Sequence, residues 1–223
     1  MDFNFLSTPR IVCESGGLGR IGSLMQDLSC TRALVVTDPG ILACGFADEA
    51  AASLRAAGIE VEIFHKVEAD PPIAVVEAAV EVARAFGADG IIGLGGGSSL
   101  DTAKVIAAAV ANDQPITDMI GINQVTDKRL PLIQVPTTAG TGSEVTWVSV
   151  LTSESHEKKA VYAPQLLPDV ALLDAKLTLG MPRHITAATA LDAMVHAIEA
   201  VTSRTRKNPI SDGMADKALV LLG

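Results

Sequence analysis

The sequence predicts an α/β fold with a doubly wound, mostly parallel sheet (Rossmann-like), followed by the start of an all-helical domain. Short apolar segments alternate with helical segments over most of the 223 residues, and glycine-rich turns follow several of the apolar segments. After Gly180-Met181-Pro182 the pattern changes to continuous helix. We therefore expect an α/β domain over residues 1–181 and the incomplete beginning of a helical domain over residues 182–223.

Composition agrees with this fold and argues against two classes of partner. Hydrophobic residues make up 48% of the chain and aromatic residues only 3%, which suits aliphatic helices packed on a parallel sheet. The net charge of −9 argues against nucleic acid. No basic region followed by an apolar run opens the chain, and no stretch approaches the roughly 18 uninterrupted apolar residues of a membrane span. We expect a cytoplasmic protein with no membrane partner.

The three cysteines, Cys13, Cys30 and Cys44, are odd in number and have no C-x-x-C spacing. This usage is typical of reduced thiols in a cytosolic compartment. We expect all three to be packing residues.

The individual elements follow from hydrophobic periodicity and from helix-stop signals. The expected strands span residues 10–14, 33–37, 59–64, 90–94, 130–135, 145–152 and 170–174. The expected helices span a run ending near residue 28, residues 48–57 and 71–86, a run ending near residue 111, and residues 185–201 and 210–222. Ligands of such sheets bind beyond the carboxyl ends of the strands. Asp38, the loop at Gly95 and the loop at Thr137 follow strand ends, so we expect them to line one crevice.

The stretch from Gly93 to Lys104, Gly-Leu-Gly-Gly-Gly-Ser-Ser-Leu-Asp-Thr-Ala-Lys, is the most informative in the chain. It indicates a buried strand, a glycine loop and a helix for which Ser98 and Ser99 are good N-cap residues. Successive glycines and a helix start present N–H groups to an anion. The alternative is a tight structural turn, but one turn seldom needs three consecutive glycines. We predict a phosphate-binding loop.

A second glycine turn competes with this loop. Gly17, Gly19 and Gly22 match G-x-G-x-x-G, and Asp38 follows at close to the spacing expected of a dinucleotide fingerprint. Because that short pattern is a weak signal, the residues alone leave the choice between the two loops open.

Two further groups of side chains have both a functional and a structural interpretation. Thr137, Thr138 and Thr141 supply hydroxyl donors that suit a phosphate or ribose, yet threonine is also an ordinary loop residue. Asp192 and His196 are four residues apart on one helix face, a spacing from which two side chains grip one metal ion. On spacing alone, a solvated Asp–His pair beside a core is the more frequent case.

Three motifs together resemble the iron-containing (group III) alcohol dehydrogenases. They occur in the order found in that family, and the resemblance extends over essentially the whole chain. The motifs are Gly95-Gly-Gly-Ser98-x-x-Asp101-x-Ala-Lys104, Pro136-Thr-Thr-x-Gly-Thr-Gly-Ser-Glu144 and Asp192-Ala-Met-Val-His196-Ala-Ile-Glu199. The resemblance implies an NAD-dependent oxidoreductase that interconverts an alcohol and its aldehyde or ketone with help from a divalent metal, Fe²⁺ or Zn²⁺. It also implies a homodimer or larger homo-oligomer.

The resemblance further implies roles for individual residues. It places the cofactor pyrophosphate against Gly96, Gly97 and Ser98, so that the first glycine turn is mainly structural. It makes Asp38 the partner of the adenosine ribose hydroxyls, and a carboxylate there favours NAD over NADP because it repels a 2′-phosphate. Asp192 and His196 become the first two of four metal ligands. The other implied cofactor-cleft residues are Asp101, Thr137, Thr138, Thr141, Thr146 and Lys158, with Lys159 as the alternative to Lys158.

The chain departs from the family pattern near its end. Family members carry two further histidine ligands in later helices, and none of His65, His156 and His184 comes from the matching region. The final apolar stretch indicates a chain cut short, in which we expect NAD binding to survive better than metal binding or catalysis. Two alternatives are a non-catalytic nucleotide-binding or interaction module and another enzyme of the superfamily, such as glycerol dehydrogenase. The sequence leaves the identity of the alcohol open.

Overall fold

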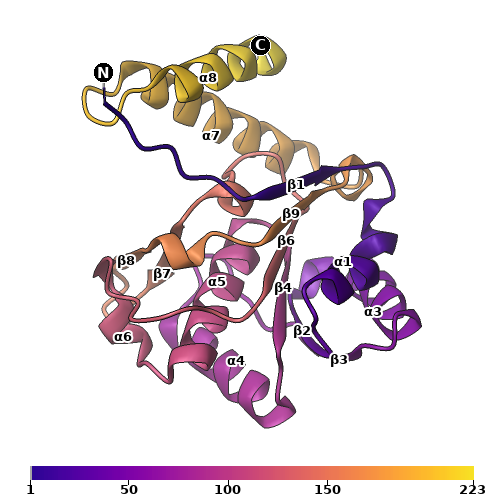
Figure 1. Cartoon of the computed structure of the whole chain (residues 1–223). Helices are drawn as coiled ribbons and strands as arrows, with labels where there is room; N and C mark the ends of the chain where they lie inside the picture. The colour runs from indigo at the N-terminus through magenta and orange to yellow at the C-terminus, as the bar shows by residue number, and fades with distance from the viewer. Residues whose placement is uncertain (1) are drawn as a thin grey trace.

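A six-stranded parallel sheet forms the centre of the protein, with strand order β1-β9-β6-β4-β2-β3 (Figure 1). This computed structural model describes residues 2–223. The inner strand β4 is buried along its whole length, because helices cover the sheet on both faces. The strands are β1 Arg10–Cys13, β2 Arg32–Val36, β3 Glu60–Phe64, β4 Gly90–Gly95, β6 Leu132–Pro136 and β9 Val170–Leu173.

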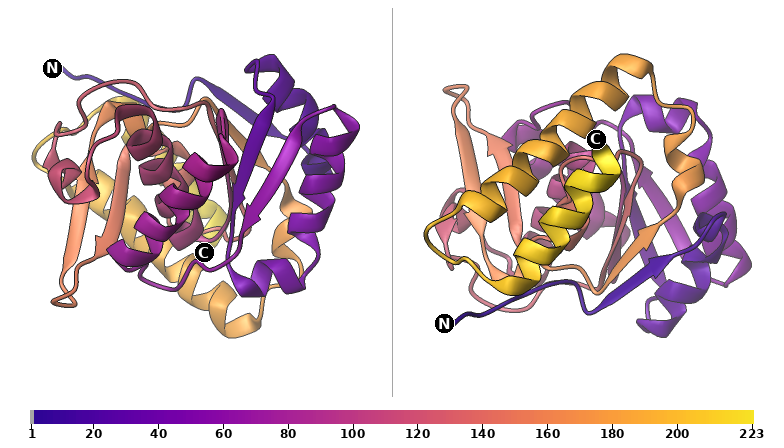
Figure 2. Two further views of the ribbon diagram at one scale, coloured as in Figure 1. Left: turned by 90° about the horizontal axis from the view of Figure 1, so that it is seen from below. Right: turned by 90° about the horizontal axis from the view of Figure 1, so that it is seen from above.

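Two helical layers sandwich this sheet and bury two aliphatic clusters (Figure 2). Helices α4 and α5 cover one face, while α1 and α3 cover the other. The α5 helix is the most buried, since it lies between the sheet and a separate β-hairpin. The helices of this part are α1 Ile21–Asp27, α2 Pro39–Ala43, α3 Phe46–Ala56, α4 Ile73–Phe86, α5 Gly97–Asn112 and α6 Ile116–Met119.

A small second sheet packs against α5 with the strand order β5-β8-β7. Its strands are β5 Gly121–Ile122, β7 Val148–Thr152 and β8 Lys158–Tyr162. β7 and β8 form an antiparallel hairpin. β7 starts three residues later than predicted because Ser143–Val145 form a 3₁₀ turn. This hairpin forms one wall of the site described below.

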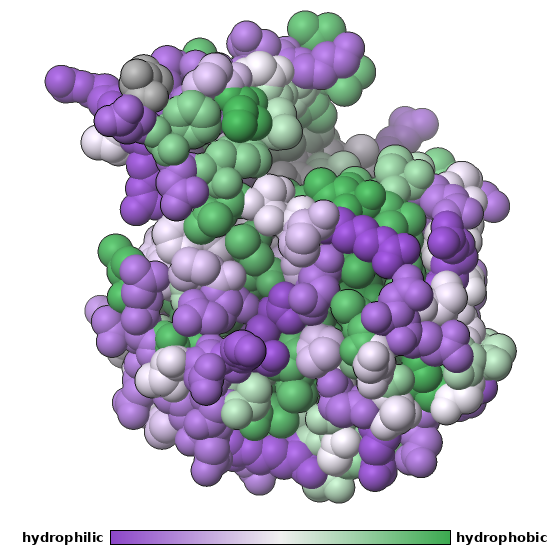
Figure 3. All heavy atoms as spheres, in the orientation of Figure 1, coloured by the Kyte–Doolittle hydropathy of each residue, from purple (hydrophilic) through white to green (hydrophobic). Residues whose placement is uncertain are grey.

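The chain ends in two helices, α7 Arg183–Thr202 and α8 Pro209–Leu222, which pack side by side beyond one end of the sheet (Figures 1 and 2). Each buries one residue, Ala197 in α7 and Ala215 in α8. Figure 3 shows apolar side chains on the surface of this protruding pair; the large exposed ones are Ile185, Leu191, Val195, Ile198, Ile210, Met214, Val220 and Leu221. By length and composition α7 would also pass as a membrane span, a weak indication on its own.

Most predicted elements are present, but the short elements α2, α6, β5 and β8 were not predicted. In α2, Asp38 is the N-cap and Pro39 occupies the first position. The expectation that all three cysteines pack in the interior is correct for Cys30 only. Cys13 ends the edge strand β1 and Cys44 ends the short helix α2, and both are exposed. Burial, reinforced by the charges of two nearby carboxylates, raises the pKa of the Cys30 thiol to about 12.

Candidate functional site

A cleft of about 610 Å³ lies where the start of α5 meets the Thr-Gly loop after β6, the β7–β8 hairpin and α7. It brings together most of the site residues that the sequence predicts, from four separate parts of the chain. The predicted residues that line it are Gly97, Ser98, Asp101, Thr141, Thr146, Lys158, Asp192 and His196. The other four, Asp38, Gly96, Thr137 and Thr138, lie against the glycine loop without lining the cleft.

The glycine loop joins β4 directly to α5. Gly95 has φ +149°, and a Cβ there would lie 2.6 Å from Ser99 Oγ, so the position demands glycine. Gly96 is the N-cap of α5. The prediction that Ser98 or Ser99 caps the helix is therefore wrong, because the helix begins at Gly97 and Ser99 Oγ turns to Asp38 at 3.4 Å. Within residues 2–223 no side chain caps α5, so its first N–H groups stay open to an anion.

The two remaining glycines of the loop differ in what they tolerate. A Cβ at Gly97 would lie 2.8 Å from Thr141 Cγ2, so this glycine permits the Thr-Gly loop to close over the helix start. A Cβ at Gly96 would meet Thr138 Cγ2 at an ordinary 3.5 Å. Thr137 N–H ties the same loop to the Gly95 carbonyl at 2.9 Å.

The competing glycine turn near the N-terminus has a different geometry. Its N–H groups at Gly16 and Leu18 donate to the Asp174 carboxylate, at 2.9 and 3.2 Å. Burial opposes ionisation of Asp174, but these backbone donors outweigh it and lower the pKa of the carboxyl. At Gly22 a Cβ would lie 2.3 Å from the Ser53 carbonyl oxygen, so glycine is needed for the approach of α1 to α3. This turn faces Asp174 and not a cleft.

Asp38 divides its carboxylate between two tasks. Oδ1 accepts from Gly40 N–H and Ile41 N–H at 2.9 and 3.0 Å, which caps α2. Oδ2 faces the glycine loop, and among residues 2–223 the one hydrogen bond it accepts is from Ser99 Oγ at a long 3.4 Å. The cap is a structural role that the sequence analysis did not assign to Asp38, and it leaves the second oxygen able to accept from a ligand.

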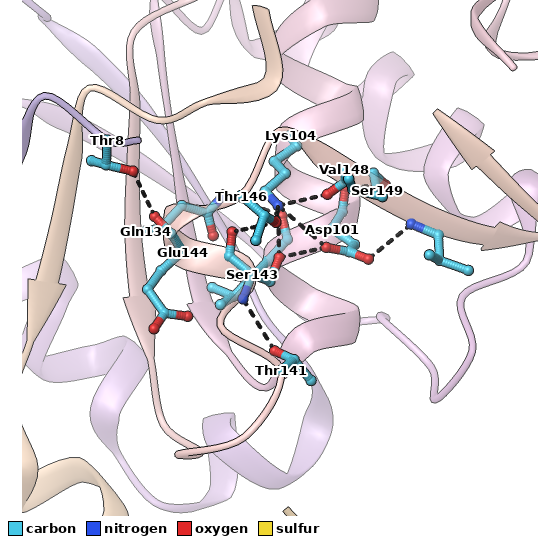
Figure 4. A network of polar contacts seen from close by, with 12 residues as sticks. Thr8, Asp101, Lys104, Gln134, Thr141, Ser143, Glu144, Thr146, Val148 and Ser149 are labelled. Carbon is cyan, nitrogen blue, oxygen red and sulfur yellow. Dashed lines mark hydrogen bonds and ion pairs between the residues drawn. The ribbon is translucent and has the colours of Figure 1, made fainter. Parts of the chain in front are cut away.

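A buried polar network joins α5 to the Thr-Gly loop and to strand β7 (Figure 4). The Lys104 side chain is fully buried, and its Nζ lies 2.8 Å from Ser143 Oγ and 3.5 Å from Asp101 Oδ1. Asp101 Oδ1 accepts from Ser143 Oγ at 2.5 Å, and Oδ2 accepts from Val150 N–H at 2.8 Å. Burial lowers the pKa of Lys104 to about 8, against the opposing attraction of Asp101.

Both carboxylate oxygens of Asp101 therefore accept hydrogen bonds from the Thr-Gly loop and the hairpin. Asp101 lines the cleft and also holds its hairpin wall in place. Lys104 and Ser143 belong to this network, and the sequence analysis quoted them in motifs without assigning them a role. The signal for Lys104 is a charged Asp-x-x-Lys pair on a helix that is mostly apolar.

The opposite wall of the cleft carries Asp192 and His196 on α7. His196 Nε2 lies 3.8 Å from Asp192 Oδ1, and the side chains are 52% and 45% exposed. Carboxylate and imidazole suit Fe²⁺ or Zn²⁺, but metal sites generally use at least three protein ligands. Over residues 2–223 no group of three or more potential ligands occurs, so this pair supplies an incomplete donor set.

The mouth of the cleft is spanned by an ion pair. Lys158 Nζ on β8 lies 2.7 Å from Asp70 Oδ1 in the loop before α4, and both residues line the cleft. Lys159 pairs instead with Glu157 at 2.6 Å and does not line it. Of the two lysines left open by the sequence, Lys158 is thus the one at the cleft. Asp70 had no sequence signal, since its place depends on how two distant loops meet.

Comparisons with known proteins identify the family of the chain. The family model of iron-containing alcohol dehydrogenases matches residues 8–175. Sulfoacetaldehyde reductase from Bilophila wadsworthia is 38% identical over 100% of this chain, and long-chain-alcohol dehydrogenase 1 from Geobacillus thermodenitrificans is 40% identical over 93% of it. The first relative is covered over 58% of its length and the second over 53%.

Solved structures give the same result. A 1,3-propanediol oxidoreductase superposes with a TM-score of 0.95 at 36% identity, covering 100% of this chain and 58% of its own. Sulfoacetaldehyde reductase from Bifidobacterium kashiwanohense, solved in complex with NAD⁺, has a TM-score of 0.92 at 31% identity, covering 100% of this chain and 59% of its own. On these matches, the chain belongs to the iron-containing alcohol dehydrogenase family.

Proposed function

We propose that this chain carries the dinucleotide-binding part of an NAD-dependent oxidoreductase that interconverts a primary or secondary alcohol and its aldehyde or ketone. The observation that carries the proposal is the uncapped start of α5, which opens into a cleft lined by threonine hydroxyls. Such a helix start is suited to a pyrophosphate. The presence of NAD⁺ in the Bifidobacterium relative supports the choice of ligand.

Each proposed cofactor contact uses a group that the fold leaves available. The N–H groups of Gly97 and Ser98 would bind the pyrophosphate, and Asp38 Oδ2 would accept from the adenosine ribose. Thr137 and Thr138 would contact the part of the dinucleotide that lies next to the Thr-Gly loop. Thr141, Thr146 and Lys158 would contact its nicotinamide half in the cleft. When bound, NAD supplies the hydride acceptor, and the chain's own residues orient it and exclude water.

The role proposed for α7 is more limited. Asp192 and His196 would be two members of a larger ligand set for Fe²⁺ or Zn²⁺ in the whole protein. Because the donor set over residues 2–223 is incomplete, we derive no step through a metal. We also propose that residues 1–181 and 182–223 are separate domains, and that the protein is a cytoplasmic homodimer or larger homo-oligomer acting on a small-molecule alcohol.

The decisive experiment places a negative charge at the start of α5. Ser98→Asp puts a carboxylate at the second position of the helix, where it stabilises the helix dipole but repels a pyrophosphate. We expect NADH affinity, measured by calorimetric titration of the 223-residue chain, to fall at least about tenfold while the melting temperature is unchanged or higher.

The matched control is Ala74→Asp, which puts the same charge at the second position of α4, outside the cleft. This variant should bind NADH like the wild type. Equal weakening by both substitutions, or a wild-type chain that is folded yet does not bind NADH, would contradict the proposal. Gly97→Val is a poorer test, because its side chain would collide with Thr141 whether or not a ligand binds there.

A non-catalytic nucleotide-binding or interaction module is the second candidate. The exposed apolar surface of α7 and α8 favours it. NADH binding and NAD-linked oxidation of short alcohols are measured on the same preparation, with Fe²⁺ or Zn²⁺ added. Turnover would exclude the module, whereas NADH binding without turnover is expected of both candidates.

A further inference from the structure

The hydrogen-bond pattern around Lys104 fixes the direction of the hydroxyl groups beside it. An ammonium group has three N–H donors and no acceptor. Lys104 Nζ directs these toward Val148 carbonyl oxygen at 2.7 Å, Ser143 Oγ at 2.8 Å and Thr146 Oγ1 at 3.1 Å. Figure 4 shows the three partners gathered around the nitrogen. Each hydroxyl oxygen that accepts from Lys104 must therefore donate its own proton to another acceptor.

The hydroxyls of Ser143 and Thr146 donate to different acceptors. Ser143 Oγ donates to Asp101 Oδ1 at 2.5 Å, so its hydroxyl proton is bound within the protein. Within the described residues 2–223, Thr146 has one acceptor for its hydroxyl proton, the Ser143 carbonyl oxygen at a long 3.3 Å. Because Thr146 lines the cleft, an acceptor on a ligand competes easily with this weak contact.

We propose that Lys104 is a positioning residue that presets the Thr146 hydroxyl as a hydrogen-bond donor to an acceptor oxygen of the bound dinucleotide. The inference rests on the proposed function, since it takes the ligand of the cleft to be NAD. Lys104 never touches the ligand itself, because it is fully buried behind Ser143 and Thr146. Its effect is to remove the alternative in which Thr146 acts as an acceptor.

The test is a double-mutant cycle read out by NADH titration. Thr146→Val keeps the shape of the side chain and removes the donor, so we expect affinity to fall about three- to tenfold. Thr146→Ser keeps the hydroxyl and should bind nearly like the wild type. Lys104→Met should cost a similar factor, and the double variant should lose no more than either single variant. The control is Thr102→Val, which should not change affinity, because the buried Thr102 hydroxyl of the same helix has no hydrogen-bond partner among residues 2–223.

A pH series supplies a readout that a purely structural role would not move. The carboxylates that act on Lys104 are Asp101 from α5 and Glu144 from the Thr-Gly loop, while β7 contributes only the Val148 carbonyl. The Lys104 ammonium loses its proton above pH 8, so the NADH affinity of the wild type should fall in this pH range toward that of Thr146→Val. The affinity of Thr146→Val should show no such pH step. Glu144→Gln should keep the step. This series needs no Lys104 variant, so it stands even where Lys104→Met fails to fold.

The outcomes separate the inference from the function on which it rests. Equal NADH affinity in wild type and Thr146→Val, additive losses in the double variant, or the same pH step in Thr146→Val would overturn the inference and leave NAD binding intact. A folded wild-type chain that does not bind NADH would overturn the proposed function and the inference with it.

Discussion

Helices α5 and α7 are both long, alanine-rich and marked by a charged motif, yet they are held in different ways. Helix α5 buries ten of its residues between the sheet and the hairpin, whereas α7 buries Ala197 alone. Asp101 and Lys104 end in a closed set of hydrogen bonds, whereas Asp192 and His196 face each other at 3.8 Å, half exposed. Residue types at a given spacing therefore indicate a candidate site, but the geometry of that site depends on the residues that pack against it. The α5 side of the cleft is therefore fixed by packing and hydrogen bonds, whereas the α7 side is not held by comparable contacts.

The largest expected difference between the helices is in core packing. Ile106→Ala empties a fully buried position on α5 and should lower the free energy of unfolding by about 2–5 kcal/mol. Ile198→Ala makes the same change at an exposed position on α7 and should stay within about 0.5 kcal/mol. Urea denaturation of the two variants gives the comparison directly. Similar losses for both would mean that α7 is buried in solution to the same extent as α5.

The next effect is a pH dependence that only α5 should show. Burial lowers the pKa of Lys104 from 10.5 in the unfolded chain to about 8 in the folded state. The unfolded state therefore binds more protons between these values, so stability should rise with pH from about 8 to 10.5 and be lost as pH falls through 8. Denaturation curves of wild type and Lys104→Met across this range isolate the effect. A Lys104 midpoint near 10.5 by NMR would contradict it.

Substitutions of Asp38 test whether this neighbour of the glycine loop affects stability and nucleotide preference. Asp38→Ala removes the cap of α2 and should cost about 1 kcal/mol of stability. Asp38→Asn can still cap but carries no charge, so we expect stability near wild type and NADPH affinity about tenfold higher relative to NADH. Thermal melts and titrations with both nucleotides check the pair. An unchanged preference in Asp38→Asn would remove Asp38 from the nucleotide site.

The smallest effects should come from the α7 side of the cleft. Asp192→Ala and His196→Ala remove half-exposed side chains and should change unfolding free energy by no more than about 0.5 kcal/mol. NADH affinity should also stay within about twofold, because the pyrophosphate is proposed to sit on α5. Added Zn²⁺ should raise the wild-type melting temperature little, since two ligands bind a metal weakly. A large Zn²⁺ shift that His196→Ala abolishes would show that α7 binds metal unaided.

Local sequence patterns predicted most of the fold, because hydrophobic periodicity reports which face of each element is buried. The strand β4, the glycine loop and the helix α5 were all predicted in order from one stretch. The cap of α5 was misplaced because serine is a good N-cap in isolation, while Ser99 here is drawn to Asp38. The helix α2 was missed because it is short and has no apolar period.

By itself, the sequence determined the strand–helix alternation, the central glycine loop and the residue types that mark the family. The resemblance already implied that the first glycine turn is structural, and the tertiary structure supplied the reason, because Asp174 accepts from the N–H groups of that turn from far along the chain. Only the tertiary structure showed that Lys158 and not Lys159 lines the cleft, and that Lys104 donates to Ser143 and Thr146. These outcomes depend on contacts between residues far apart in the chain, which local periodicity and spacing do not encode.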